Sequence, residues 1–369
     1  MRITAAVSRD PQVPPALEQL ELASPGPGEI LVRVATAGIC HTDLRAHSGV
    51  IALTPRPVVL GHEGAGVVEA VGEGVTQVKP GDRIVMSGSS CGHCSRCRDN
   101  LPSYCVEGMH RSFAGSRLDG STALSRDGER VHSHFFGQSS FATHAIADAR
   151  GAVRLPDDVP FEIASPLGCG VITGAGAVLR SFGLRAGQSL AVFGAGGVGL
   201  SAIMAAKLAG ARSIVAIEPL AARRELALQL GATSVVDPAA GDLVPAVRAL
   251  HKDGLDFALN TTTQPAIFDA AQRVLGARGV LGFVSATPQP YAVPLYPLLV
   301  GGQSLRGIVG GDAAPQQFIP MLLDFWRQGR FPLERLIQTF PFADIAGAFA
   351  AVRSGAVIKP VLMIHQESR

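Results

Sequence analysis

The sequence contains few aromatic and few charged residues, and both shortages narrow the class of protein. Only 5% of its 369 residues are aromatic, with a single tryptophan, and 17% are charged. Positive and negative charges nearly cancel, leaving a formal net charge of +2, so the composition does not argue for nucleic acid or an anionic membrane as a partner. The 47% hydrophobic fraction can bury a large core, which excludes a disordered chain.

Long apolar runs are also missing. The apolar stretches are interrupted by Gly, Lys or Arg, as in residues 201–210, and none reaches the ~20 residues that a membrane span needs. Residues 1–17 carry an early arginine and lack the apolar run of a secretory signal peptide. We therefore expect a soluble cytoplasmic protein with no membrane partner.

Six cysteines are present, and four lie close together in the chain. Cys91, Cys94, Cys97 and Cys105 give the spacing C-x2-C-x2-C-x7-C. Four thiolates can close a tetrahedral shell around one zinc ion, which leaves no open position and predicts a structural site. An iron–sulfur cluster also uses four cysteines, but nothing else in the sequence suggests electron transfer. His93, inside the loop, is interpreted as a bystander.

The other two cysteines, Cys40 and Cys169, allow a second metal site together with His62. Two thiolates and one imidazole make a three-ligand zinc shell with one position left for water or substrate. This is also the ligand set of the catalytic zinc in alcohol dehydrogenases. Open zinc polarises an alcohol and lowers its pKa, which favours hydride transfer to an adjacent nicotinamide. From the residues alone, buried apolar thiols remain an equal alternative.

The pattern of secondary structure changes along the chain. Residues 30–35 and 66–71 are short strand-like runs in a β-rich first part, and from about residue 171 strands alternate with helices. This alternation predicts a parallel, doubly wound sheet. Its strands are expected at 189–193, 213–217, 234–236, 256–259 and 280–284, and its helices at 198–208 and 221–230. The polar segment 106–134, with Arg111, Arg117, Arg126 and Arg130, is interpreted as a surface lobe with a solvated basic face.

A glycine motif stands between the first of these strands and its helix. Residues 194–199 read Gly-Ala-Gly-Gly-Val-Gly, which matches G-x-G-x-x-G in the context that dinucleotide binding requires. Gly194 permits the tight turn, Gly196 the approach of the pyrophosphate, and Gly199 close helix packing, while Gly197 and Val198 open the helix.

An acidic residue follows at the end of the next strand. Glu218 is placed to accept hydrogen bonds from ribose hydroxyls and to repel the additional phosphate of NADP, so NAD is the expected cofactor. Arg223 and Arg224 weaken this interpretation, because a guanidinium could hold that phosphate. The alternative is that Glu218 is an ordinary surface carboxylate.

These motifs together resemble the zinc-containing medium-chain alcohol dehydrogenases over nearly the whole chain. The resemblance is carried by residues 38–43 (GICHTD), 61–66 (GHEGAG), the four-cysteine loop, 167–170 (LGCG) and the glycine motif, in that order. Within the family, the chain looks most similar to bacterial aryl-alcohol (benzyl-alcohol) dehydrogenases. Residues 135–142 (FFGQSSFA) support this group, although glutathione-dependent formaldehyde dehydrogenases share that stretch.

The resemblance implies an α/β fold of two domains with the active-site cleft between them. A GroES-like β-rich catalytic domain with a structural zinc lobe would comprise residues 1–170 and 309–369, and a Rossmann NAD-binding domain residues 171–308. Two zinc ions per chain are implied, one catalytic on Cys40, His62 and Cys169 and one structural. A subunit contact near residues 285–310 is expected by analogy, in a homodimer or homotetramer.

The resemblance also assigns roles to individual residues. Asp43 and Glu63 would stand behind the catalytic ligands, with Asp43 orienting the His62 ring. Thr42 would hydrogen-bond the substrate oxygen and pass its proton outward. On the cofactor side, Thr173 would line the nicotinamide pocket, Val198 would support the ring, and Lys359 would contact the pyrophosphate.

Three positions depart from the family pattern. His41 stands where many relatives carry a pyrophosphate-binding Arg, and Arg45 where the best-studied members have a relay His, so His41 or His47 is a candidate substitute relay. Ser87 stands where some relatives have an aromatic wall, which favours a bulky benzyl-type or allylic alcohol such as geraniol over ethanol. Two alternatives remain: an S-(hydroxymethyl)glutathione dehydrogenase, and a non-catalytic dinucleotide-binding protein that keeps structural zinc.

Overall fold

The computed structural model describes residues 1–285 and 290–365, which form two compact units. The first unit contains residues 1–169, 314–323 and those from 333 onward, and the second contains 170–313 and 324–332. The sequence-based boundary at 308/309 differs from this division. Residues 309–313 join the second unit because the turn Gly310–Asp312 packs on helix α5 (Gly170–Gly176), and the Ser181 hydroxyl donates a hydrogen bond to Asp312.

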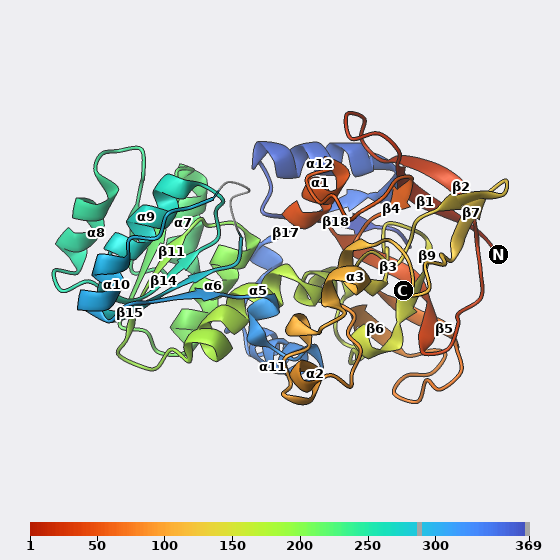
Figure 1. Cartoon of the computed structure of the whole chain (residues 1–369), viewed down its shortest axis with the longest axis horizontal. Helices are drawn as coiled ribbons and strands as arrows, with labels where there is room; N and C mark the ends of the chain where they lie inside the picture. Colours follow the sequence, from red (N-terminus) through yellow and green to blue (C-terminus); the bar gives the residue numbers. More distant parts are fainter. Residues whose placement is uncertain (286–289, 366–369) are drawn as a thin grey trace. The chain divides into compact units, whose positions relative to one another are not determined.

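The first unit is built on two largely antiparallel sheets (Figure 1). One has the strand order β4-β1-β2-β7-β8, and the other has the order β10-β6-β5-β3-β18-β17, with β9 also paired to β3. The strands are β1 Arg2–Ser8, β2 Ala16–Leu22, β3 Glu29–Gly38, β4 Val58–Val59, β5 Glu63–Val71, β6 Arg83–Met86, β7 Leu124–Arg126, β8 Glu129–Val131, β9 His144–Asp148, β10 Ala152–Arg154, β17 Ile337–Pro341 and β18 Lys359–Met363.

Alternation of side chains along these strands forms the core of the first unit. In β3, Ile30, Val32 and Val34 are fully buried and pack with Val68 and Ile84 of the neighbouring strands. The C-terminal strand β18 returns to this sheet, where Leu362 pairs with Ala37 of β3. The helices of this unit are short: α1 His41–His47, α2 Ser95–Arg98, α3 Gly108–Phe113, α4 Phe161–Ala164 and α12 Ile345–Ser354, with α11 Pro315–Arg327 shared between the units.

The segment 106–134 is more ordered than the sequence suggested. It contains α3 and the hairpin β7–β8, and β7 pairs with β2. Arg117 forms a two-pronged ion pair with Glu29 at 2.7 and 2.8 Å, and Arg111 pairs with Glu107 and Asp148. The interpretation of these two arginines as a solvated face is therefore wrong, because their charges are committed to partly buried carboxylates.

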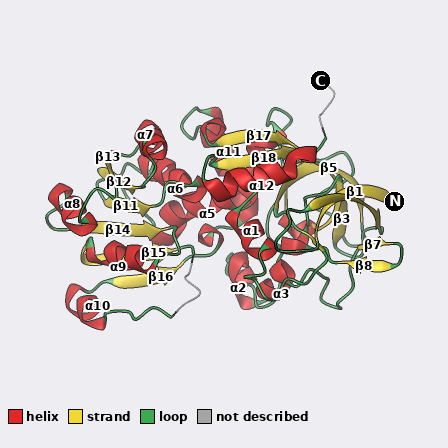
Figure 2. Ribbon diagram, turned by 90° about the horizontal axis from the view of Figure 1, so that it is seen from above, coloured by secondary structure: helices red, strands yellow, loops and turns green. Residues whose placement is uncertain are grey.

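The second unit is a six-stranded parallel sheet with the order β13-β12-β11-β14-β15-β16, visible in this order in Figure 2. The doubly wound parallel sheet predicted from the sequence is confirmed. Its strands are β11 Ser189–Phe193, β12 Ser213–Ile217, β13 Ser234–Val236, β14 Leu255–Asn260, β15 Leu275–Phe283 and β16 Ser304–Gly307. Its helices, besides α5, are α6 Gly197–Leu208, α7 Ala221–Leu230, α8 Leu243–Leu250, α9 Pro265–Arg273 and α10 Leu295–Gly301.

The strand order reverses between β11 and β14, and this reversal positions the glycine motif. In open parallel sheets, ligands bind at the carboxyl ends of the strands at such a switch point. The glycine motif follows β11 at that end, and Thr261 follows β14 beside it, with its hydroxyl donating to Phe193 O at 2.8 Å.

Within the described residues, no single helix is long and apolar enough to cross a membrane. One bent pair of helices, Phe161–Gly168 with Gly170–Phe182, reaches that length and composition together, and most of its residues are buried in the fold. Of the range 285–310, where a subunit contact was expected, residues 286–289 lie outside the described part of the chain.

Candidate metal and dinucleotide sites

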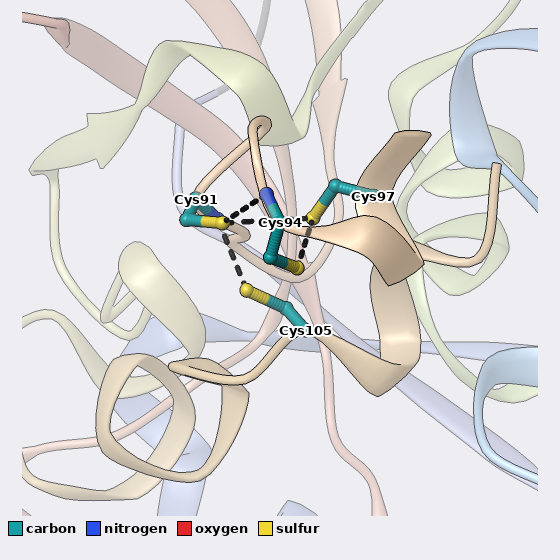
Figure 3. A group of neighbouring side chains, drawn as sticks. All are labelled: Cys91, Cys94, Cys97 and Cys105. Carbon is teal, nitrogen blue, oxygen red and sulfur yellow. Dashed lines mark hydrogen bonds between the residues drawn. The ribbon is translucent and has the colours of Figure 1, made fainter. Parts of the chain in front are cut away.

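The four cysteines of the loop converge, with their sulfur atoms all within 4.8 Å of one another (Figure 3). Cys94 precedes α2, Cys97 lies within it, and Cys105 ends the turn Pro102–Tyr104. Backbone N–H groups of the loop point at the thiols: Cys94 N lies 3.3 Å from Cys91 Sγ, and Cys91 N lies 3.2 Å from Cys105 Sγ. Such donors stabilise thiolates, and those of Val106 and Cys97 lower the pKa of Cys94 to about 6.

His93 and Glu107 lie close to this cluster, within the same 4.8 Å of Cys91. The His93 ring is 3.0 Å from Cys91 O through Nδ1. Four sulfur donors within 4.8 Å of one another suit zinc, so the residues fit a closed tetrahedral shell.

The second cluster is assembled from three distant segments of the first unit. Cys40 precedes α1, His62 precedes β5, and Cys169 follows the turn Ser165–Gly168. The ligand atoms of these three residues and of Glu63 lie within 4.8 Å of one another, and His62 Nε2 is 3.2 Å from Cys169 Sγ. The sheet brings two of them together, because β3 and β5 pair Gly38, two residues before Cys40, with Glu63, the residue after His62.

Asp43 holds this cluster in place through both carboxylate oxygens, and its side chain is fully buried. Oδ1 lies 2.9 Å from His62 Nδ1 and accepts from Gly61 N at 3.1 Å, while Oδ2 accepts from Cys40 N at 2.9 Å. The bond to Nδ1 leaves Nε2 of His62 facing Cys169, which is the arrangement that a metal-ligating imidazole requires. The Cys2His donor set therefore fits an open zinc shell.

The buried charges of the cluster are strongly coupled. Hydrogen bonding from Cys169, aided by His62 and Lys359, holds the pKa of Cys40 well below its ordinary value. Burial opposes the imidazolium, but Asp43 and Cys40 together raise the pKa of His62 well above its usual range. The site therefore favours a thiolate at Cys40.

Glu63 and Lys359 form a buried ion pair next to the cluster. Lys359 Nζ is 2.8 Å from both Glu63 oxygens and donates to Ile39 O at 3.4 Å. Burial alone would lower the pKa of Lys359, but Glu63 raises it above its ordinary value, so the ammonium stays charged. The pyrophosphate contact that the resemblance implied for Lys359 differs from this arrangement, in which the ammonium is committed to Glu63 and Ile39.

The residues considered for proton transfer lie on or beside α1. The Thr42 hydroxyl is 3.8 Å from Cys40 Sγ, and His41 is exposed at the first turn of the helix. His47 is turned elsewhere: its Nδ1 contacts the Ser8 hydroxyl at 2.8 Å, its ring stands edge-on to Phe349, and it is 2% exposed. Burial lowers the pKa of His47, which favours a neutral ring inside the core. Of the two histidines suggested as relays, His41 alone reaches solvent.

Two neighbours of the cluster were not expected from the sequence as site residues. The Phe136 ring stacks on His62, with centroids 4.5 Å apart and planes inclined by 25°. Gln138 contacts His62 O and Gly64 N through its amide. Only the stretch 135–142 (FFGQSSFA) pointed to this region, and it was interpreted as a subgroup signature. Ser87, expected to widen a pocket, donates its hydroxyl to Gly168 O at 2.7 Å.

The glycine motif of the second unit has the geometry that dinucleotide binding needs. Gly199 lies so close to Gly194 O that an added Cβ would stand 1.9 Å from it, whereas Gly196 has open space where a side chain would be. Helix α6 begins at Gly197, so its free N–H groups and positive dipole end face that space. Thr173 lies on α5, which packs against α6 and Val198.

Glu218 is buried, with 4% of its surface exposed, so the interpretation as an ordinary surface carboxylate is wrong. Its oxygens accept from Ala195 N at 2.7 Å and from Leu220 N at 3.0 Å, which ties it to the glycine turn. Arg224 is bound to Glu218 O and Pro219 O, both at 2.7 Å, and pairs with Asp237 at 3.0 Å. Arg223 lies on the same helix, α7.

Comparison with known families places both units in one class. Residues 26–157 match the alcohol dehydrogenase GroES-like domain, and residues 197–327 match the zinc-binding dehydrogenase domain. The prediction of a GroES-like domain together with a Rossmann-type domain is confirmed.

Individual relatives agree with this class. The chain is 48% identical to a geraniol dehydrogenase of Castellaniella defragrans over 97% of both chains. A zinc-binding-domain alcohol dehydrogenase of Burkholderia ambifaria superposes with a TM-score of 0.96 at 43% identity, covering 99% of this chain and all of that one. Benzyl alcohol dehydrogenase of Acinetobacter calcoaceticus gives 0.95 at 38% identity, with 99% and 100% coverage. The chain belongs to the zinc-containing medium-chain alcohol dehydrogenase family.

Proposed function

We propose that this alcohol dehydrogenase uses NAD to oxidise a bulky primary alcohol, benzyl-type or allylic such as geraniol, reversibly to its aldehyde. The observation that carries the proposal is the meeting of Cys40, His62 and Cys169, three zinc-type ligands from distant segments. A tetrahedral shell on these three ligands keeps a fourth position for the substrate oxygen, since the nearby Glu63 carboxylate is bound to Lys359. The relatives named for geraniol and benzyl alcohol support the substrate class.

In this proposal, Cys40, His62 and Cys169 hold the catalytic zinc. Zinc in an open shell acts as a Lewis acid on the substrate oxygen, which eases loss of the hydroxyl proton and of hydride. Asp43 fixes the His62 ring through Nδ1. Glu63, paired with Lys359, supplies a buried charge behind the ligands without leaving an unpaired carboxylate.

Thr42 is the proposed contact of the substrate hydroxyl. Its hydroxyl lies beside Cys40 Sγ and can both accept and donate a proton, as a relay requires. His41 is the neighbouring residue on α1 and is exposed, and an imidazole can both take up and release a proton, so we propose that it passes the proton outward. Replacing His41 with Gln should change the pH dependence of kcat, and an unchanged profile would exclude His41 from the relay.

The dinucleotide is proposed to bind at the glycine motif. Gly194, Gly196, Gly197 and Gly199 let the pyrophosphate approach the start of α6, and Glu218 takes the ribose hydroxyls. Thr173 and Val198 are proposed to contact the nicotinamide, and Arg223 is proposed to contact the adenosine side. The ion pair of Arg224 with Asp237 supports NAD over NADP, because that guanidinium is already engaged.

The preference for NAD is tested by kcat/KM with both cofactors. We expect NAD to be preferred, and Glu218→Ala to lower kcat/KM for NAD by about 10–100-fold, since hydrogen bonds to a charged group contribute roughly 1.5–3 kcal/mol. A preference for NADP in the unaltered protein would refute this part of the proposal.

A second, structural zinc is proposed on Cys91, Cys94, Cys97 and Cys105, and the chain is proposed to form a homodimer or homotetramer. The apolar side chains of Leu295, Tyr296 and Leu299 on α10 are more than 70% exposed beside β16, a strand with one described neighbour, which supports a subunit contact there. Light scattering after size-exclusion chromatography tests the assembly.

The main experiment combines zinc content with turnover. Purified protein is analysed for zinc per chain and assayed for NAD reduction with benzyl alcohol, cinnamyl alcohol, geraniol, hexanol, ethanol and the glutathione–formaldehyde adduct. About two zinc ions per chain, with the highest kcat/KM on aromatic or allylic alcohols, support the proposal. A requirement for glutathione, or a higher kcat/KM for ethanol, would refute the substrate class. One zinc and no turnover after remetallation would refute the catalytic site.

A further inference from the structure

The amide of Gln138 occupies an unusual place beside the Cys40, His62 and Cys169 cluster. Gln138 is 1% exposed, and its amide uses both ends: Oε1 accepts from Gly64 N at 3.0 Å, and Nε2 donates to His62 O at 3.0 Å. These two backbone groups flank Glu63 and face the same side of β5. Strand β6 pairs with β5 only as far as Ala65, opposite Val85. The Gln138 amide therefore makes the hydrogen bonds that a peptide group of β6 would make to β5, beyond the point where the two strands stop pairing.

The same amide reaches the segment that carries Cys169. Gln138 Nε2 lies 3.4 Å from Ser87 O, and the Ser87 hydroxyl donates to Gly168 O at 2.7 Å. Gly168 approaches β6 so closely that an added Cβ would stand 2.2 Å from Met86 O. A continuous buried polar path thus joins His62, Gln138, Ser87 and the residue before Cys169. It links two of the three candidate ligands independently of the Asp43 contacts.

The backbone around Gln138 has a conformation that residues other than glycine rarely adopt. His134, Phe136 and Ser139 have φ values of 63°, 53° and 52°, in the left-handed region. Such conformations persist where surrounding contacts fix them, and they gather at functional sites. Here Ser139 Oγ accepts from Phe135 N and donates to Val59 O, while the Phe136 ring stacks on the His62 imidazole.

We propose that Gln138 is a positioning residue for the catalytic metal: its amide sets the spacing between the His62 and Cys169 segments. This inference rests on the proposed zinc site. The hydrogen bonds that the structure describes for the Gln138 amide go to backbone groups, so its loss should loosen one metal site and leave the other intact. Partners behind metal ligands commonly change metal affinity by about 10–100-fold when they are removed.

The experiment measures zinc affinity on the full chain. Apoprotein is titrated with zinc against a chromophoric chelator, and the Co(II)-substituted protein gives the visible spectrum of each thiolate site. The Cys40→Ser variant, which keeps the four-cysteine loop, identifies the affinity and spectrum of that loop. Gln138→Met removes the three hydrogen bonds of the amide at similar side-chain length. Gln272→Met is the matched control, because Gln272 is equally buried, at 1% exposed, but lies on α9 in the second unit.

We expect Gln138→Met to lower the metal affinity of the Cys2His site by about 10–100-fold and to alter the Co(II) spectrum of that site. The affinity of the four-cysteine loop should be unchanged, and Gln272→Met should behave like the unaltered protein at both sites. If Gln138→Met has the same affinity and spectrum as the unaltered protein at each site, the proposal is overturned. It is also overturned if Gln272→Met weakens metal binding to the same extent. If Gln138→Met does not fold, Gln138→Glu tests the proposal instead. This variant keeps the acceptor for Gly64 N and lacks the donor for His62 O. Unaltered affinity in that variant overturns the proposal.

Failure of the proposed function is distinguishable from failure of this inference. Unaltered protein that binds a single metal refutes the catalytic zinc before any variant is compared. Unaltered protein that binds two metals, together with a Gln138→Met variant that binds both equally well, refutes only the role of Gln138.

Discussion

The two cysteine clusters of the first unit differ in where their stabilising partners come from. In the four-cysteine loop, the groups that point at sulfur are backbone N–H groups of the loop itself, such as those of Cys91 and Cys94. Around Cys40, His62 and Cys169, the partners are buried side chains from remote segments: Asp43, Glu63 with Lys359, and Gln138. The loop can form its site locally, whereas the second cluster exists only when the sheets of the first unit have formed.

This difference has a chemical consequence. Four sulfur donors close the first shell, so a metal there can stabilise the loop but has no position for a substrate. Three donors leave the second shell open, and the side chains behind it can tune ligand orientation and charge without competing for the metal. The comparison predicts that substitutions in the four-cysteine loop will mainly lower stability, and that substitutions in the Cys40, His62 and Cys169 cluster will mainly lower turnover.

The largest expected effect is the loss of the loop metal in Cys94→Ser. Binding of structural zinc to short peptides contributes roughly 10–16 kcal/mol, so the loop should open without it. We expect zinc content to fall by about one per chain, with rapid proteolysis inside residues 91–113 and a lower Tm. Cys40→Ser is the control. A protease-resistant loop with unchanged Tm in Cys94→Ser would contradict a structural role for this metal.

The second prediction reverses the pattern. Cys40→Ser should also lose about one zinc per chain, but kcat/KM should fall by on the order of 10³-fold, since a Lewis-acid metal contributes several kcal/mol to the transition state. Tm should change little, because serine is a preferred residue at the start of a helix and Asp43 still accepts from the backbone N–H of residue 40. Steady-state kinetics and calorimetry on the same preparation test this. Retained turnover would favour a non-catalytic dinucleotide-binding protein.

The same comparison explains what could be predicted from the sequence. The spacing of Cys91 to Cys105 limits how far apart the sulfur atoms can lie, so this cluster followed from the sequence alone. The glycine motif could be predicted equally well, because its strand, turn and helix are consecutive in the sequence. Cys40, His62 and Cys169 could be grouped only by elimination and resemblance, since their meeting depends on the register Gly38–Glu63 and on the approach of Gly168 to Met86.

Partners brought by tertiary contact were harder to predict. Nothing in the residues near Gln138 indicates a bond to His62 O, because the vacant ladder position beside β5 arises from where β6 ends. The resemblance implies a phosphate contact for Lys359, but a lone lysine in the sequence carries no sign of the distant carboxylate of Glu63 that its ammonium binds. Arg117 looked like a solvated charge for the same reason, although it binds Glu29.

The third prediction tests the contact that fastens the segment following the four-cysteine loop to β3, the strand leading to Cys40. Glu29 accepts from Arg117, Gly26 N and His134, and although burial opposes ionisation, these partners lower its pKa to about 2 from an ordinary 4.5. A depressed folded-state pKa means that the unfolded chain binds the proton first. The contribution, about 3 kcal/mol, is therefore complete above pH 4.5 and is lost as the pH falls toward 2.

Glu29→Gln should accordingly lower the free energy of unfolding at pH 7, and the difference from the unaltered protein should shrink below pH 4.5. Denaturant unfolding of both proteins in matched buffers measures this difference, in which acid loss of metal cancels. Glu21→Gln is the control, because Glu21 lies on the neighbouring strand β2 and is exposed. A difference that stays constant from pH 7 to pH 3 would show that the Glu29 charge does not contribute.

The smallest effect is expected for Asp43→Asn, and it probes the dependence of the second cluster on remote side chains. Three donors converge on the carboxylate: Cys40 N, Gly61 N and His62 Nδ1. An asparagine can satisfy those at one oxygen position, but its NH₂ group then faces an N–H donor at the other. We expect zinc affinity at the Cys2His site to fall by about 10–100-fold, with loop affinity unchanged. Zinc titration of the apoprotein measures both, and Asp99→Asn, an exposed change beside the loop, is the control. Weakening at the loop in Asp43→Asn would mean that the two clusters are coupled, contrary to a loop that holds its metal by its own backbone.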